Sequence, residues 1–191
     1  PCEACRAKQG TPLLEDAVLD VPDVRQSTSF SCGAAAVVSV SRFFGVEPDT
    51  EAEAIRALQT SPAAGTPPQH IVDVLTAHDL AVEHHDWWSL DGIKSHLGQG
   101  HPAICPVQMY GSQDEYNADE SGHWVVLVGY NGENVVLQDP VSGRVEMEAD
   151  EFRRRWTDKA EDGTPFERYA VVVKGKGAAP ESPPPDKPEV N

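Results

Sequence analysis

The chain has 191 residues, enough for one domain with tails, and a core region of about 150 residues can bury about 70% of its unfolded surface. Acidic residues outnumber basic ones, 31 to 15, and the net charge of −16 disfavours nucleic acid as a partner. No apolar run approaches the roughly 18 residues that a membrane-spanning helix requires, so we expect a soluble chain without a membrane span.

Residues 1–19 form a polar lead-in that holds two of the four cysteines, Cys2 and Cys5. Their spacing is that of half a zinc site or of a redox pair, but the sequence has no second pair with metal-ligand spacing. We therefore expect a local disulfide or two free thiols, and no metal site. The chain begins at Pro1, from which we expect that an upstream segment is missing. That leaves the compartment open and favours a secreted or extracytoplasmic location.

The segment from Gln26 to Gly45 joins a polar turn to an apolar helix. Its apolar residues recur at helical spacing after Cys32, and Gly45 is a plausible C-cap. Cys32 thus falls in the first turn, where free backbone N–H groups and the helix dipole favour a thiolate. Gln26 lies in the preceding loop, from which its amide and the Cys32 N–H could face one substrate oxygen. Taken alone, Cys32 is more typical of a small buried hydrophobic residue than of a nucleophile.

Two further helices are predicted near residues 50–59 and 67–79. Both begin with a capping-box pattern, Thr50 with Glu53 and Thr66 with Gln69, and the second places Pro67 at the first helical position. A strand at 81–85 and a short helix at 89–97 follow.

Beyond residue 102 the pattern changes to strands, predicted at 103–109, 123–130, 134–138, 144–148 and 168–174, with a helix at 149–156. Helices followed by an antiparallel sheet predict an α+β fold, in which the nucleophile helix of the N-terminal half packs on a C-terminal sheet. Residues 20–174 form the predicted domain. Residues 175–191 are rich in proline and charge, and we expect an extended, disordered tail.

His123 and Asp139 lie at the outer ends of two adjacent strands. A turn at Asn131-Gly132 joins these strands, so antiparallel pairing brings both residues to the same end of the sheet. A histidine at a strand start is by itself more often exposed or satisfied by a local contact, but here an acid is predicted beside it. Cysteine, histidine, acid and amide together can make a thiolate nucleophile.

At these residues the sequence resembles the papain-like cysteine peptidases of the bacteriocin-leader-processing type and their stand-alone relatives. The resemblance rests on these blocks: Gln26, Cys32, Gly33 and Ala35; Phe43, Phe44 and Gly45; Gly65 and Thr66; residues 122–126; Asp139 and Pro140. It implies a papain-like fold, a nucleophile at Cys32, a general base and acid at His123, an orienting Asp139 and an oxyanion donor at Gln26. It also implies a peptide or protein substrate and no cofactor. Ser31 stands where many leader-processing members carry an aspartate, so the stand-alone members are the nearest look-alikes.

The sequence therefore predicts a cysteine peptidase that hydrolyses peptide or isopeptide bonds through a Cys-His-Asp triad and a thioester acyl-enzyme. Three alternatives remain open: a transferase that uses the same thioester, a toxin-type effector that cuts another protein, and a non-catalytic binding module on the same scaffold.

Two features beside His123 have more than one interpretation. The acidic loop at 110–121 is either a solvated surface loop or a lid, and its spacing lacks the pattern of calcium loops. Trp124 is more often a core residue type, but its position predicts a wall of the substrate pocket and a shield for the His123–Asp139 contact.

Overall fold

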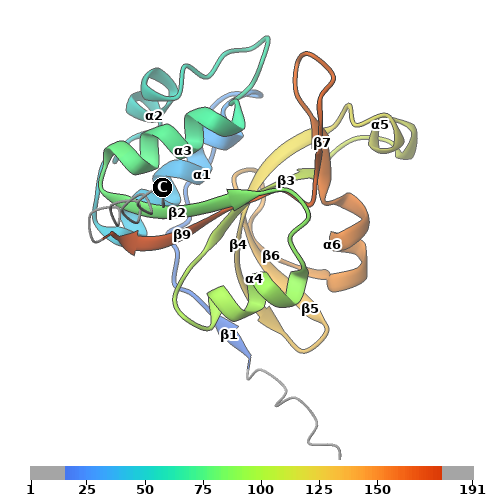
Figure 1. Cartoon of the computed structure of the whole chain (residues 1–191). Coiled ribbons are helices and arrows are strands. Elements are labelled where there is room, and N and C mark those ends of the chain that lie inside the picture. The colour runs from blue at the N-terminus through green and yellow to red at the C-terminus, as the bar shows by residue number, and fades with distance from the viewer. Residues whose placement is uncertain (1–15, 178–191) are drawn as a thin grey trace, which may run out of the picture.

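The structure is a computed structural model that describes residues 16–177. Cys2, Cys5 and the part of the predicted tail beyond residue 177 lie outside the described residues. A seven-stranded sheet forms the centre of the molecule, in the order β2-β9-β3-β4-β5-β6, with β1 paired to β4 (Figure 1). All its pairs are antiparallel. The strands are Ala17–Val18 (β1), Leu80–His85 (β2), Ala103–Gln108 (β3), Gly122–Asn131 (β4), Asn134–Asp139 (β5), Gly143–Glu148 (β6) and Ala170–Lys176 (β9).

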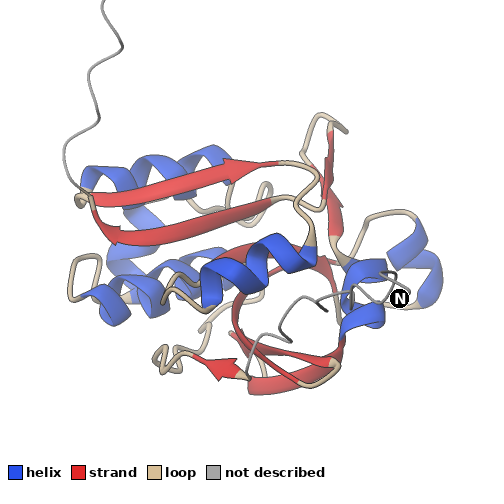
Figure 2. Cartoon of the chain, turned by 60° about the horizontal axis from the view of Figure 1, so that its bottom comes forward, coloured by secondary structure: helices blue, strands red, loops and turns tan. Residues whose placement is uncertain are grey.

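Helices cover both faces of this sheet. Figure 1 shows α1, α2 and α3 on one side and α4 and α6 on the other, and Figure 2 shows how strongly the sheet curves between its ends. The helices are Cys32–Phe44 (α1), Glu51–Ala57 (α2), Pro68–Ala77 (α3), Leu90–Leu97 (α4), Gln113–Asn117 (α5) and Ala149–Arg155 (α6). The α+β prediction is therefore confirmed, with one addition: strand β2, from the helical half of the chain, pairs with β9.

The sheet has one hydrophobic core on each face, which explains why the sequences of its central strands are continuous apolar runs. Side chains alternate across a strand, so Val126 and Val128 pack with α1 while Val125 and Leu127 pack with α4 and α6. A strand buried on both faces needs apolar residues at every position. Packing on both faces fixes the position of strand β4 in the molecule, and β4 lies against α1.

Helix α1 is the central helix of the first core. Its residues from Cys32 to Ser41 are all buried, because α2 and α3 cover the side that the sheet does not. Gly45 ends the helix in a left-handed conformation, with φ 66°, and its N–H donates to Arg42 O. The predicted start and end of this helix are confirmed.

The capping box at Thr66 is wrong. Helix α3 begins at Pro68, Pro67 is its N-cap, and no side chain caps it. The Thr66 hydroxyl is instead hydrogen-bonded to Thr60 Oγ1 at 2.8 Å, so it is not free to cap the helix. The capping box of Thr50 and Glu53 is confirmed.

Four short stretches differ from the predicted boundaries. Part of the polar lead-in forms β1, because Ala17 pairs with Tyr130 of β4. The acidic loop contains α5, which Ser112 and Glu115 start with a capping box of their own. A ribbon of Thr157–Lys159 (β7) and Pro165–Glu167 (β8) precedes β9. Strand β9 continues to Lys176, two residues into the predicted tail, because Leu80 of β2 pairs with Lys176.

Candidate active site

The hairpin of β4 and β5 brings His123 and Asp139 together as predicted. Its register pairs Asn131 with Asn134 next to the turn and Val126 with Gln138 near the open end. His123 Nε2 lies 2.7 Å from Asp139 Oδ1, and both side chains are buried, 6% and 0% exposed. A buried charged pair is stable only when its remaining lone pairs and protons are also satisfied, so the surroundings of the carboxylate matter.

The loop that follows β5 satisfies the Asp139 carboxylate. Val141 N–H donates to Oδ1 at 2.9 Å, Ser142 N–H donates to Oδ2 at 3.3 Å, and the Tyr110 hydroxyl donates to Oδ2. Burial alone would raise the pKa of Asp139. The hydrogen bonds from His123, Tyr110 and the Val141 N–H outweigh burial and lower that pKa to about 2. Asp139 is therefore a carboxylate over the whole physiological range.

Cys32 is the first residue of helix α1 and is near enough to His123 for its thiol to affect the pKa of the ring. Burial lowers the pKa of His123, but hydrogen bonds with Asp139 and with the Cys32 thiol, together with their charges, raise it to about 9. The imidazole is therefore mostly protonated at neutral pH. A positive ring beside the sulfur, and the first N–H groups of α1, are the two features that stabilise a thiolate.

Gln26 lies at the same end of the molecule, in the loop before α1. Its backbone N–H donates to Pro140 O at 3.0 Å, which ties this loop to the residue after Asp139. Its side-chain Nε2 donates to Thr28 O at 2.6 Å, and its buried Oε1 has no partner among residues 16–177. One amide hydrogen is thus engaged within the loop and one remains for a ligand, so the oxyanion role of Gln26 stays a prediction.

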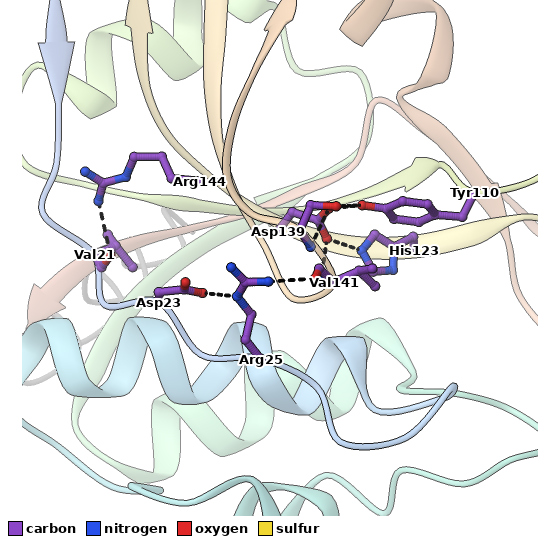
Figure 3. A network of polar contacts seen from close by, with 9 residues as sticks. Val21, Asp23, Arg25, Tyr110, His123, Asp139, Val141 and Arg144 are labelled. Carbon is purple, nitrogen blue, oxygen red and sulfur yellow. Dashed lines mark hydrogen bonds and ion pairs between the residues drawn. The ribbon is translucent and has the colours of Figure 1, made fainter.

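The loop before α1 is also held to the loop after β5 by an arginine. Arg25 Nη1 donates to Val141 O at 2.7 Å, and Arg25 Nε pairs with Asp23 Oδ1 at 2.7 Å (Figure 3). Arg144 reaches back to Val21 O at 3.3 Å, farther along the same segment (Figure 3). These contacts fix the approach of α1 to the sheet, which the sequence does not predict.

A pocket of about 750 Å³ opens beside Cys32. The loop at 62–68 lines it with small and apolar residues, while Glu120 and residues 158–162 contribute four carboxylates and one lysine. Asp158 packs on Gly122, and burial raises the pKa of Asp158 to about 6. The volume is in the range of ligand-binding clefts, and the pocket has room for a peptide segment next to the sulfur.

Trp124 lines this pocket as well, so the structure is consistent with the predicted wall. Its indole N–H donates to Thr66 O at 3.1 Å, and the side chain packs in the first core. The aromatic ring that lies on the His123–Asp139 pair is a different one, that of Tyr110, whose centroid is 5.4 Å from the His123 ring. Sequence reasoning missed Tyr110. The available signal was its place just after β3, the strand that pairs with β4 and sets Gln108 opposite Gly122.

No group of three or more His, Cys, Asp or Glu side chains between residues 16 and 177 could hold a metal ion. None of the described helices is long and apolar enough to cross a membrane. Cys105 is fully buried in β3, and burial raises the pKa of its thiol far above the usual range.

Comparison with known proteins identifies relatives over most of the chain. A family model described as the Peptidase_C39 like family matches residues 18–162. An uncharacterized protein of Methanothermobacter thermautotrophicus is 29% identical over 134 residues, which are 70% of this chain and 82% of that protein. An uncharacterized protein of Methanothermobacter marburgensis is 28% identical over 137 residues, with the same two coverages.

Solved structures share the fold at lower identity. A double glycine motif protease from an AMS/PCAT transporter, in complex with the leader peptide, superposes with a TM-score of 0.60 and 18% identity, over 82% of this chain and 94% of that one. The peptidase domain of Streptococcus ComA, a bi-functional ABC transporter, gives 0.60 and 18%, over 80% and 96%. A putative C39-like peptidase from Bacillus anthracis gives 0.63 and 14%, over 83% and 97%.

Proposed function

The chain belongs to the C39-like peptidase family, and on that basis we propose that it is a cysteine peptidase that hydrolyses peptide or isopeptide bonds. Cys32 is the proposed nucleophile, His123 the general base and acid, Asp139 the residue that orients His123, and Gln26 the oxyanion donor. The observation that carries the proposal is the hydrogen bond of His123 to the buried Asp139 carboxylate, which raises the pKa of the ring, next to a cysteine that lines a pocket.

The proposed reaction starts from the ion pair of thiolate and imidazolium. The Cys32 sulfur attacks the substrate carbonyl carbon, and the carbonyl π electrons move to the oxygen, which the Cys32 N–H and the Gln26 amide hold. The intermediate collapses to a thioester as the C–N bond breaks and His123 gives its proton to the leaving amine. Water then attacks the thioester, His123 takes its proton, and the thiolate leaves. Asp139 keeps the ring oriented throughout.

The substrate is proposed to be a peptide or an exposed protein segment. A related peptidase is solved with a leader peptide, and the pocket of about 750 Å³ beside Cys32 has both apolar and charged residues in its lining. We propose residues 20–174 as the peptidase domain. Secretion or an extracytoplasmic location remains a prediction, which fractionation of the producing cells would test.

A peptide-library digestion tests the proposal directly. The wild type is expected to release products that mass spectrometry identifies, and Cys32→Ala is expected to release none. Iodoacetamide should alkylate Cys32 at neutral pH, while the buried Cys105 stays unlabelled and acts as an internal control. A Cys32 that reacts only above about pH 8.5 would be an ordinary thiol and would contradict the proposal.

A further inference from the structure

Tyr110 is the one side chain besides His123 that binds the Asp139 carboxylate among the described residues. Its hydroxyl contacts Oδ2, while His123 and the Val141 N–H share Oδ1. The other partner of Oδ2 is the Ser142 N–H at 3.3 Å, a long hydrogen bond. Of the two groups that bind Oδ2, Tyr110 is thus the side chain, and it holds this oxygen while His123 binds the other one.

The hydrogen bonds from Ser142 to Tyr110 and from Tyr110 to Asp139 all donate in the same direction. A carboxylate only accepts, so the single Tyr110 proton goes to Asp139. Ser142 Oγ lies 2.6 Å from the Tyr110 hydroxyl oxygen and must then donate to it. A donor whose own oxygen accepts a hydrogen bond is polarised and binds its carboxylate more strongly. The series Ser142, Tyr110, Asp139, His123 thus reaches from the surface to the proposed base (Figure 3 shows its last three members).

The Tyr110 ring has a second contact, with His123 itself. The two rings meet edge to face, at 87° and 5.4 Å between centroids. Tyr110 is 55% exposed, whereas His123 and Asp139 are buried, so the phenol ring lies between the pair and solvent. Hydrogen bonds to a charged group are stronger where water is kept away.

The surrounding groups hold Tyr110 in this position. The residue has a left-handed backbone, φ 66°, and the loop beside it is closed by the hydrogen bond from Met109 N–H to Ser121 O at 3.0 Å. The charged groups near its hydroxyl are Asp139 and the Arg25 guanidinium. The Arg25 guanidinium binds Asp23 and Val141 O, whereas the Tyr110 hydroxyl donates directly to the Asp139 carboxylate.

We propose that Tyr110 is a positioning residue of the active site, whose hydroxyl fixes the Asp139 carboxylate toward His123 and whose ring shields that pair from water. The inference rests on the proposed function. It assigns a role to the start of the acidic loop, which the sequence left as a surface loop or a lid.

Three variants separate the hydroxyl from the ring. Tyr110→Phe removes the hydroxyl and keeps the ring, and Tyr110→Ala removes both. Tyr116→Phe removes a phenol hydroxyl from α5 in the same loop, where the ring lies under Arg155, and serves as the matched control. With a peptide found in the library digestion, we expect Tyr110→Phe to lower kcat about ten-fold at unchanged KM. The acidic limb of its pH profile should move to higher pH, because Asp139 loses a hydrogen bond that stabilises its anion.

A second measurement needs no substrate. In proton–nitrogen NMR at neutral pH, the His123 Nε2–H should be protected in the wild type and in Tyr116→Phe, displaced in Tyr110→Phe, and lost to solvent exchange in Tyr110→Ala. A Tyr110→Phe protein that matches Tyr116→Phe in kcat, pH profile and Nε2–H resonance would overturn the inference. If the wild type cleaves nothing, the proposed function fails, and the resonance alone then decides whether Tyr110 orients the pair.

Discussion

At the scale of single residues, the site depends on Asp139, because its carboxylate is fully buried and the neighbouring groups donate hydrogen bonds to it. Four hydrogen bonds, from His123, Tyr110 and two backbone N–H groups, compensate for its loss of solvation. Its hydrogen bond with His123 is in turn the largest of the contacts that raise the pKa of the ring. The chemistry proposed for Cys32 therefore rests on contacts that the cysteine does not make itself.

Gln26 is the residue whose role is easiest to separate from folding. Replacing a single oxyanion donor raises the activation free energy by about 2.7 to 4 kcal/mol, so we expect Gln26→Ala to lose activity by a factor on the order of 10² to 10³. Gln26→Glu keeps the size of the side chain and loses the donor, so it should be similarly impaired. The measurement is kcat/KM on a cleaved peptide.

Gln113→Ala is the control for Gln26, because the exposed side-chain amide of Gln113 in α5 has Asn117 as its one hydrogen-bond partner among residues 16–177. It should retain wild-type activity. Full activity of Gln26→Ala would remove the oxyanion assignment and leave the backbone N–H of Cys32 as the donor.

At the scale of elements, the position of Cys32 is decided by how closely the start of α1 approaches the loop before α3. A Cβ on Gly33 would lie 2.5 Å from Thr66 Cβ, a distance that real contacts do not reach. Thr66 is held from both sides, by Thr60 and by the Trp124 indole that donates to its carbonyl oxygen. The Gly33 and Thr66 positions thus form one contact between the proposed nucleophile helix and the pocket wall.

We expect Gly33→Ala to destabilise the protein by about 1 to 3 kcal/mol, because overpacking forces the helix start or the loop to move. The movement displaces Cys32, so alkylation of Cys32 and peptide cleavage should both slow. Urea unfolding measures the first effect and kinetics measures the second.

Gly98→Ala provides the comparison. Gly98 is the C-cap of α4, and the nearest atom to a Cβ added there would lie an ordinary 3.6 Å away, so stability and activity should be unchanged. A Gly33→Ala protein as stable and as active as Gly98→Ala would mean that the close contact with Thr66 does not position the cysteine.

At the scale of the whole molecule, the fold brings the start of helix α1 to the ends of strands β4 and β5, where His123 and Asp139 form a buried ion pair. The first core packs α1 on the sheet, and the loops on either side of the pair are joined by Gln26 N–H to Pro140 O and by Arg25 to Val141 O. Unfolding separates all these groups at once. The protonation of the pair is therefore linked to the stability of the whole domain.

The sign of this linkage follows from the two pKa values. His123 is raised in the folded state to about 9, so its contribution is complete below its unfolded pKa of about 6.5 and is lost as the pH rises through 9. Asp139 is lowered to about 2, so its contribution is present above about 4 and is lost as the pH falls through 2. The pair stabilises the fold most between about pH 4 and 6.5.

We therefore expect the free energy of unfolding to fall by roughly 1 to 3 kcal/mol between pH 6.5 and 9.5. Urea titrations at intervals across this range measure it. In His123→Gln this decrease should be absent, while the titration of surface groups common to both proteins remains. Parallel curves for the wild type and His123→Gln would show that the ring is not preferentially protonated in the folded state.

Local patterns determined much of this protein in advance. Helical spacing and a terminal glycine identified α1 and put Cys32 at its start, and a turn signal between two apolar runs identified the hairpin that joins His123 to Asp139. These signals are short-range, because periodicity, caps and tight turns depend on neighbouring residues. The family resemblance added the prediction that Cys32, in the helical half of the chain, lies close to His123 and Asp139 in the half that forms the sheet.

The tertiary structure alone decided which loops reach the site. Tyr110 binds Asp139 across 29 positions, and Arg25 binds the Val141 carbonyl across 116. The predicted capping box at Thr66 does not form for the same reason, because the Thr66 hydroxyl is bound to Thr60 and its carbonyl oxygen to the Trp124 indole. Such contacts depend on where the packed cores leave each loop, and no local pattern in the sequence encodes that position.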